Sequence, residues 1–545
     1  MSAVSFHKLH ILIVDDFENF RSTLYKMLMD IGIGNVDSAH NGEDALRYCR
    51  SRSYDVILCD YNLGKGKTGQ QVLEDLRIGK TLCTDSLFIL VSAETSRSIV
   101  MAAYDFEPDA YLTKPITTKV LEQRLVRLLA QRQALLPISK AVKAKNFIEA
   151  EKLCLAEIGK GSRYSVSCQK ILGNLYLEHN QLPKGEKLFN DVLAIRELEW
   201  AQLGMAKIRL QQGDYIGAQK WVSDVLQVNH LSMKAYDLQV EIYKALGQKK
   251  ALQDTLQQAV ELSPLAILRQ QNLGMVAKEN RDFKVACDAF KQSVKIGENS
   301  SYDRADIHIQ FSQAVIELYS FDKEAAKPLM RDALKSVLNV ENKFSSSSDD
   351  VLQANFLASQ LYACAGDEAR AKNQFEMGRK RLAASAAKSI AVEIEMIRTM
   401  QRLGQNEEAK KLLFELSLKY QQDEASLELL DAIQDEPQSQ KNKRMVAEIN
   451  KKGISIYNEK NYHLAAQAFQ SALKTLPHHV GLRLNCAQAL LDELKQSFDK
   501  VTSDLLWEML SKVEDLITHR HEQFARYRQL REGFENLLRE QEKPH

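Results

Sequence analysis

Two short runs of sequence decide the fold of this chain: Ile11-Leu12-Ile13-Val14-Asp15-Asp16 and Asp55-Val56-Ile57-Leu58-Cys59-Asp60. Each run is continuously apolar and ends in aspartate, which is typical of a strand that is buried on both faces of a sheet. Similar runs occur at 36–39, 87–91 and 110–112, and helical patterns separate them near 18–31, 42–51, 70–78, 95–104 and 117–130. This alternation predicts an α/β, doubly wound, five-stranded parallel sheet over residues 1–132.

Polar residues follow four of the five predicted strands. They are Asp15 and Asp16 after the first strand, Asp60 after the third, Ser92 after the fourth and Lys114 after the fifth. We expect these side chains to meet, because the carboxyl ends of parallel strands lie at one edge of a sheet. Three carboxylates repel one another unless a cation neutralises them, and all-oxygen ligation suits Mg²⁺. The set predicts transfer of a phosphoryl group to a carboxylate, with the metal spreading the transition-state charge.

The same motifs resemble the receiver domain of bacterial two-component response regulators. The matching stretches are ILIVDD (11–16), DVILCDYNL (55–63), LVSAE (90–94) and DAYLTKP (109–115). The resemblance implies that Asp60 is the phosphoacceptor. It also implies that Asp16, Asp60 and the backbone carbonyl of Asn62 bind Mg²⁺ directly, while Asp15 acts through water.

The resemblance assigns roles to further residues. It implies that Lys114 pairs with the phosphoryl group, that Ser92 hydrogen-bonds to it, and that Tyr111 rotates during the switch. Asn62 and Glu94 are the residues that chemotaxis-type receivers carry at positions affecting the lifetime of the acyl phosphate. A cis bond is expected before Pro115, and the loop 63–69 is a residue longer than is common in the family.

A 34-residue period replaces the strand pattern after residue 137. Small or apolar residues recur at intervals of 35, 33, 34 and 34, at Ala150, Gly185, Ala218, Leu252 and Ala286. This period resembles tetratricopeptide repeats and implies an all-α tetratricopeptide superhelix. The match is strong over 138–300, has insertions over 301–430 and returns at 446–478. We expect a linker at 431–445 and capping helices at 480–540, and we expect the receiver to contact the first hairpins, 138–200.

Composition excludes several classes of protein. The chain has 73 basic and 72 acidic residues, so it lacks the basic field of a non-specific nucleic-acid binder. No apolar run approaches the roughly 18–20 residues of a membrane span, and the eight cysteines have no zinc-binding spacing. The sequence predicts a cytoplasmic protein. The histidines at 478, 479, 519 and 521 have no acidic or cysteine partner at ligand spacing, so no metal site is predicted there.

The predicted function is phosphorelay signal transduction rather than an enzyme activity on other substrates. A sensor histidine kinase or phosphotransfer protein would phosphorylate Asp60, and the repeats would bind a protein target. One alternative is a degenerate receiver that acts as a constitutive scaffold, and another is nucleic-acid binding through the C-terminal helices. A phosphatase of the haloacid-dehalogenase type is disfavoured, because it needs Asp-x-Asp after the first strand and Asp15 and Asp16 are adjacent.

Overall fold

The computed structural model describes residues 6–83, 85–93, 107–344, 348–385, 389–517, 519 and 521–541. The chain divides into two compact units, residues 1–336 and 337–545. The first unit begins with a short 3-10 helix (Phe6–Lys8) and a parallel sheet of order β2-β1-β3-β4-β5. Its strands are β1 (His10–Val14), β2 (Asn35–Ala39), β3 (Val56–Asp60), β4 (Leu87–Ser92) and β5 (Ala110–Thr113). The predicted five-stranded parallel sheet is confirmed.

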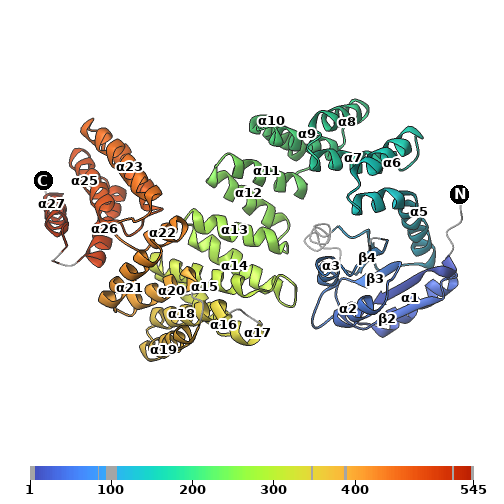
Figure 1. The fold of residues 1–545 in the computed structure, drawn as a ribbon, viewed down its shortest axis with the longest axis horizontal. Coiled ribbons are helices and arrows are strands. Elements are labelled where there is room, and N and C mark those ends of the chain that lie inside the picture. The colour runs from blue at the N-terminus through green and yellow to red at the C-terminus, as the bar shows by residue number, and fades with distance from the viewer. Residues whose placement is uncertain are drawn as a thin grey trace. The chain divides into compact units, whose positions relative to one another are not determined.

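Helices cover both faces of this sheet (Figure 1). They are α1 (Glu18–Asp30), α2 (Gly42–Ser51), α3 (Gly69–Ile78) and α5 (Thr118–Lys143), and the helix predicted at 95–104 lies outside the described residues. On one face of the sheet, Ile11 and Ile13 pack in a buried cluster with side chains of α1 and α5. On the other face, Leu12 and Val14 pack in a buried cluster with side chains of α2 and α3. Burial on both faces explains the continuous apolar runs.

Helix α5 is longer than the sequence predicted. The expected helix ended at residue 130, but α5 continues through Pro137 to Lys143 without a break. Its buried side chains Leu121, Leu125 and Leu129 are followed by Ile138 and Ala141, which belong to the first buried clusters of the helical array. Proline removes one backbone donor, and packing on both halves of the helix outweighs that loss.

Helical hairpins follow α5 in the first unit. Their helices are α6 (Phe147–Gly159), α7 (Ser165–Glu178), α8 (Leu182–Ile195), α9 (Glu199–Gln211), α10 (Tyr215–Val228), α11 (Met233–Ala245), α12 (Lys249–Leu262), α13 (Ile267–Glu279), α14 (Phe283–Gly297), α15 (Ala305–Phe321) and α16 (Lys323–Leu338). Helices α7, α9, α11 and α13 begin 34 residues apart. A side-chain carbon on Gly173 or Gly204 would lie 2.5 Å from the Phe189 ring, so the helices approach closely only with glycine there.

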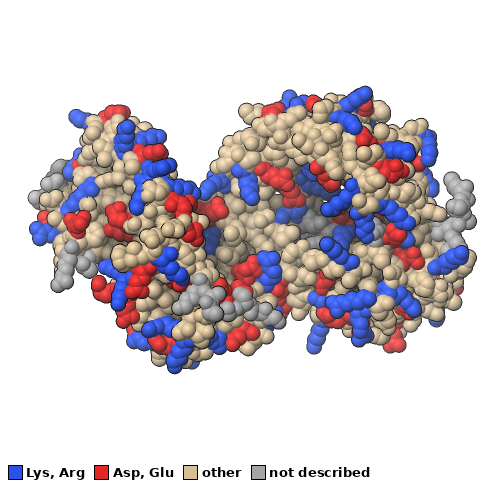
Figure 2. Space-filling view, viewed as in Figure 1, with Lys and Arg blue, Asp and Glu red and all other residues tan. Residues whose placement is uncertain are grey.

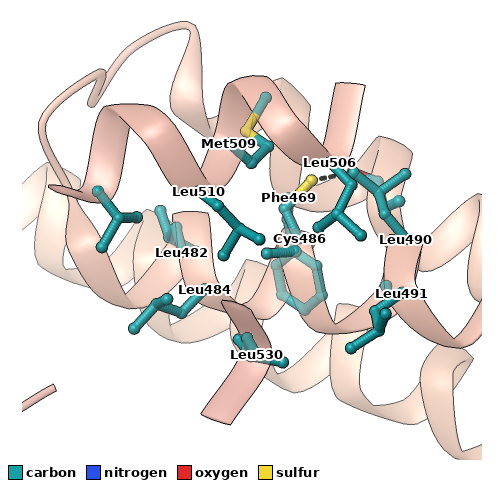
Figure 3. Close-up of a cluster of buried hydrophobic side chains, with 14 of the residues drawn as sticks. Phe469, Leu482, Leu484, Cys486, Leu490, Leu491, Leu506, Met509, Leu510 and Leu530 are labelled. Atoms are coloured by element: carbon teal, nitrogen blue, oxygen red, sulfur yellow. Dashed lines mark hydrogen bonds between the residues drawn. The ribbon is translucent and has the colours of Figure 1, made fainter. Parts of the chain in front are cut away.

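The described residues of the second unit form helices and their connections, without a strand. Its helices are α17 (Val340–Lys343), α18 (Ser348–Cys364), α19 (Glu368–Ala384), α20 (Ile390–Arg402), α21 (Asn406–Lys419), α22 (Glu424–Asp431), α23 (Gln440–Asn458), α24 (Tyr462–Leu473), α25 (Val480–Gln496), α26 (Lys500–Leu516) and α27 (Phe524–Gln541). Figure 3 shows the last helices packed around Phe469 and Cys486, with Leu490, Leu506 and Leu530 nearby. The helices of this unit bury two separate hydrophobic clusters, one among α18–α22 and one among α24–α27.

The connection between α22 and α23 is shorter and better ordered than the predicted linker at 431–445. Only residues 432–439 are non-helical. The buried Asp431 carboxylate accepts hydrogen bonds from the Ser439 hydroxyl (2.5 Å), the Ser439 N–H (3.2 Å) and the Asn442 amide (3.0 Å). Ser439 in turn caps α23 by accepting from the Asn442 N–H. These hydrogen bonds fix the conformation of the connection. Helix α23 therefore begins at Gln440, inside the predicted linker.

Charges of both signs are mixed on the face of the molecule that Figure 2 shows. Figure 2 shows lysine and arginine interspersed with aspartate and glutamate on the visible face. No helix among the described residues is long and apolar enough to cross a membrane.

Candidate functional site

Three aspartates meet at the carboxyl edge of the sheet. Val14 pairs with Cys59 in the β1–β3 register, so the residues that follow, Asp15 and Asp60, emerge side by side. Carboxylate oxygens of Asp15, Asp16 and Asp60 all lie within 4.8 Å of one another. Asp15 is 1% exposed and Asp60 is 8% exposed, whereas Asp16 is exposed. The predicted acidic pocket is therefore present, with one wall open to solvent.

Lys114 supplies the cation of this pocket. Its Nζ lies 2.8 Å from Asp15 Oδ2 and 2.8 Å from Asp60 Oδ2, and it sits 4.0 Å from the centre of the Phe20 ring. The backbone N–H of Lys114 donates to the Ser92 carbonyl (2.8 Å), which fixes the end of β5 against β4. The Lys114–Pro115 bond is cis, as predicted.

The pocket holds more negative than positive charge. Burial raises the pKa of Asp60, as does the Asp15 charge, and the hydrogen bond from Lys114 only partly opposes this rise. Burial also acts to lower the pKa of Lys114, but its hydrogen bonds to Asp15 and Asp60 outweigh burial and raise that pKa overall. One ammonium therefore faces three carboxylates. A divalent cation would offset the remaining negative charge.

Two glycines shape the backbone around the aspartates. A side-chain carbon on Gly69, the first residue of α3, would lie 2.0 Å from the Asp60 carbonyl oxygen, and the Gly69 N–H donates to the Tyr61 carbonyl (2.9 Å). Gly64 has a φ of +72°, and a side-chain carbon there would lie 2.9 Å from Asp16 Oδ2. Only glycine lets the loop after β3 pass this close to the pocket.

Three further predicted site residues, Ser92, Tyr111 and Asn62, lie at or next to the same edge. Ser92 is buried at the end of β4 and pairs in register with Thr113. Tyr111 in β5 is half-buried and packs against the cluster under α2 and α3. Asn62 is exposed, and its side chain accepts from the Gly64 N–H (3.2 Å). Glu94 lies outside the described residues.

Sequence reasoning missed two residues that hold the pocket. Phe20 lies beneath the Lys114 ammonium, and buried Arg21 donates to the Asp15 carbonyl oxygen (2.7 Å). Both belong to α1, whose first turn follows β1 directly. The sequence contains one signal that could have identified them, which is their position in the first helical turn after Asp15 and Asp16.

The loop and helix that follow Asp60 contact the helical array of the same unit. The Gln71 side-chain amide donates to the carbonyl oxygens of Glu298 (3.1 Å) and Ile296 (3.3 Å). Lys67 donates to the Asn299 carbonyl, and the Ser301 hydroxyl donates to Asp75. Figure 1 shows α3 beside the end of α14. The receiver also meets the first hairpin through α5, which packs on α6 within the predicted range 138–200. The contact of α3 with residues 296–301 is an additional one that the sequence did not predict.

A cavity of about 280 Å³ lies beside this contact. The residues that line it include Tyr61, Gln70 and Glu74 from the receiver side, and Ile267 and Lys295 from the array. Glu74 is 4% exposed, and its Oε2 has no hydrogen-bond partner. Burial, with a smaller contribution from the Asp75 charge, raises the pKa of Glu74 to about 7.

The fold and pocket together define an acidic site with one lysine at the carboxyl edge of a doubly wound sheet, and comparison with known proteins identifies the family of this part of the chain. The response regulator receiver domain model matches residues 11–126. The chemotaxis protein CheY of Pseudomonas aeruginosa is 31% identical over 118 residues, which is 94% of that protein and 22% of this chain. CheY-3 of Vibrio cholerae is 28% identical over 128 residues, 97% of that protein and 24% of this chain. The chain belongs to the response regulator receiver domain family through this N-terminal part.

A solved structure is similar over the same part. The Vibrio cholerae chemotaxis protein CheY4 is 26% identical, and the match covers 98% of that chain and 22% of this one with a TM-score of 0.21. The relatives described here therefore account for about a quarter of the sequence.

Proposed function

We propose that this protein is a two-component response regulator in which Asp60 accepts a phosphoryl group from a sensor histidine kinase or a phosphotransfer protein. The observation that carries the proposal is the pocket itself. It places Asp15, Asp16 and Asp60 within 4.8 Å of one another, with Lys114 bonded to two of them.

In the proposed reaction, an Asp60 carboxylate oxygen forms a bond to phosphorus while the phosphorus–nitrogen bond of the donor phosphohistidine breaks. The histidine nitrogen leaves with the bond's electron pair and is protonated. Mg²⁺ would be held by Asp16, Asp60 and the Asn62 carbonyl, with Asp15 acting through water, and it would spread the negative charge of the transferring group. Lys114 would bind a phosphoryl oxygen from the other side.

The remaining residues would respond to phosphorylation and affect the hydrolysis of the acyl phosphate. Ser92 would donate its hydroxyl to the phosphoryl group, and Tyr111 would change its position with it. Asn62 and Glu94 would affect the rate at which water removes the group, as expected from their positions two residues after Asp60 and Ser92. None of these steps needs a further enzyme activity of the chain.

The output would be protein binding by the helical array, which we assign to tetratricopeptide-like repeats. The 34-residue spacing of α7, α9, α11 and α13 and the glycine–phenylalanine contacts support this assignment. The loop after Asp60 reaches Lys67 and Gln71, which bond to residues 296–299. Phosphorylation would therefore shift an equilibrium between docked and released states of this contact.

The test is phosphorylation of the full chain with acetyl phosphate, measured by intact-protein mass spectrometry. We expect a gain of one phosphoryl group that requires Mg²⁺ and is lost with Asp60→Asn. A constitutive scaffold would show no gain in any variant. An output through nucleic acid would instead show binding that weakens steeply with salt.

A further inference from the structure

His479 is buried without hydrogen-bond partners. It precedes α25 as its N-terminal cap residue and is 4% exposed. Neither Nδ1 nor Nε2 of its ring has a hydrogen-bond partner. Leaving a buried polar group unsatisfied costs roughly 1–3 kcal/mol, and native structures contain few such groups. Both ring nitrogens are therefore available to a ligand from outside the chain.

Two carboxylates lie in front of this ring. Asp435 and Glu436 come from the 432–439 connection between α22 and α23. One carboxylate oxygen of each and a ring nitrogen of His479 all lie within 4.8 Å of one another. His479 Nδ1 is 3.9 Å from Asp435 Oδ1, which is too long for a hydrogen bond. This spacing leaves room between the three groups.

The Asp435 carboxylate is held in place by two donors. The Val480 N–H donates to its Oδ1 (2.7 Å), and His521 Nε2 lies 2.9 Å from its Oδ2. His521 Nδ1 accepts from the Gln523 N–H (3.1 Å), so the neutral ring carries its proton on Nε2 and donates it to Asp435. Histidine–carboxylate pairs of this kind orient the ligands of protein metal sites.

We propose that Asp435, Glu436 and His479 form a binding site for a divalent transition-metal ion of the zinc type. The ion would take one imidazole nitrogen and two carboxylate oxygens from the chain, with water completing a four-coordinate shell. The imidazole ligand favours zinc-type ions over Mg²⁺, which prefers oxygen ligands. Asp435 and Glu436 precede His479 by more than 40 residues, so no local ligand spacing in the sequence indicates this site.

The proposed role is structural and independent of Asp60. The ion would join the connection before α23 to the start of α25 within the second unit. Because metal that binds only the folded site contributes its binding free energy to folding, occupancy would raise the thermal stability of this part of the chain.

The test is titration of the full-length, chelator-treated protein with Zn²⁺ in buffer with excess Mg²⁺, using calorimetry. We expect one tight Zn²⁺ site in the wild type, weakened at least about tenfold in Glu436→Gln and His479→Gln. Glu436 is exposed, so its variant keeps the test valid if His479→Gln fails to fold. The control is His463→Gln, which changes an exposed histidine on α24 that pairs with Glu493.

A second readout is the thermal unfolding midpoint with and without Zn²⁺. We expect Zn²⁺ to raise this midpoint in the wild type and in His463→Gln but not in Glu436→Gln. Equal Zn²⁺ affinity in the wild type and Glu436→Gln, or no tight binding by the wild type, would overturn the proposal. Both results would leave the assignment of Asp60 unaffected.

Discussion

The Lys114 ammonium lies 2.8 Å from the Asp60 carboxylate, although the two residues are 54 positions apart in sequence. Lys114 also bonds to Asp15, so one cation links two of the three aspartates of the pocket. A phosphoryl group on Asp60 would offer new oxygens to the same ammonium. Lys114 would then exchange a carboxylate partner for a phosphoryl partner, which gives the pocket a way to report its own modification.

Asp60→Asn is expected to abolish labelling by acetyl phosphate. The amide is nearly isosteric but is not a nucleophile, so the fold should remain while the reaction stops. Asp16→Ala should abolish labelling too, through lost Mg²⁺ affinity. The matched control is Asp30→Asn, at an exposed residue that ends α1. Labelling of the Asp60 variant at the wild-type level would disprove the site.

Lys114→Ala is expected to leave Mg²⁺ binding intact or severalfold tighter, because the ammonium competes with the metal for Asp15 and Asp60. The variant should still bind beryllofluoride, but this binding should no longer alter the contact between α3 and the helical array. Calorimetric titration with Mg²⁺ gives the metal affinity. A tenfold loss of that affinity would show that Lys114 has another role.

Gly69→Ala is expected to destabilise the receiver by roughly 2–3 kcal/mol. The added methyl group would lie 2.0 Å from the Asp60 carbonyl oxygen, so the start of α3 must move. Gly159→Ala is the control, since nothing lies within 4 Å of the added group at the end of α6. The free energy of unfolding from urea titration should fall only in the first variant.

Glu74→Gln is expected to stabilise the protein at pH 8 but hardly at pH 4.5. Burial raises the pKa of Glu74 from 4.5 to about 7 in the folded protein, so the folded state holds this proton more tightly than the unfolded state. The stability linked to it is present below pH 4.5 and is lost as the pH rises through 7. The amide removes that loss, which corresponds to roughly 3 kcal/mol at most.

Thermal unfolding of both proteins across this pH range checks the prediction. Glu122→Gln, at an exposed residue of α5, is the control. A difference between wild type and Glu74→Gln that does not change with pH would mean that folding does not raise the pKa of Glu74.

The sheet and its pocket could be predicted from sequence because they follow from local patterns. The runs ending in Asp15 and Asp60 identify strands, and parallel topology brings their ends together. The 34-residue period likewise gave the hairpins of the first unit. These features need only neighbouring residues and one topological rule.

The features that sequence reasoning missed depend on tertiary approach. Gln71 meets Glu298 across 227 positions, and Asp435 meets Val480 and His479 across more than 40. The path of α5 through Pro137 was missed because proline is read locally as a break, while packing at Ile138 decides the outcome. No local sequence pattern indicates contacts between residues that are this far apart in the chain.

Hydrogen exchange on the full chain, with and without beryllofluoride and Mg²⁺, tests most directly the claim that Asp60 controls the contact between α3 and the array. The account predicts that protection changes together in residues 62–78 and 293–303, and that Asp60→Asn shows neither change. Protection that changes within the receiver while 293–303 stays constant would contradict the account.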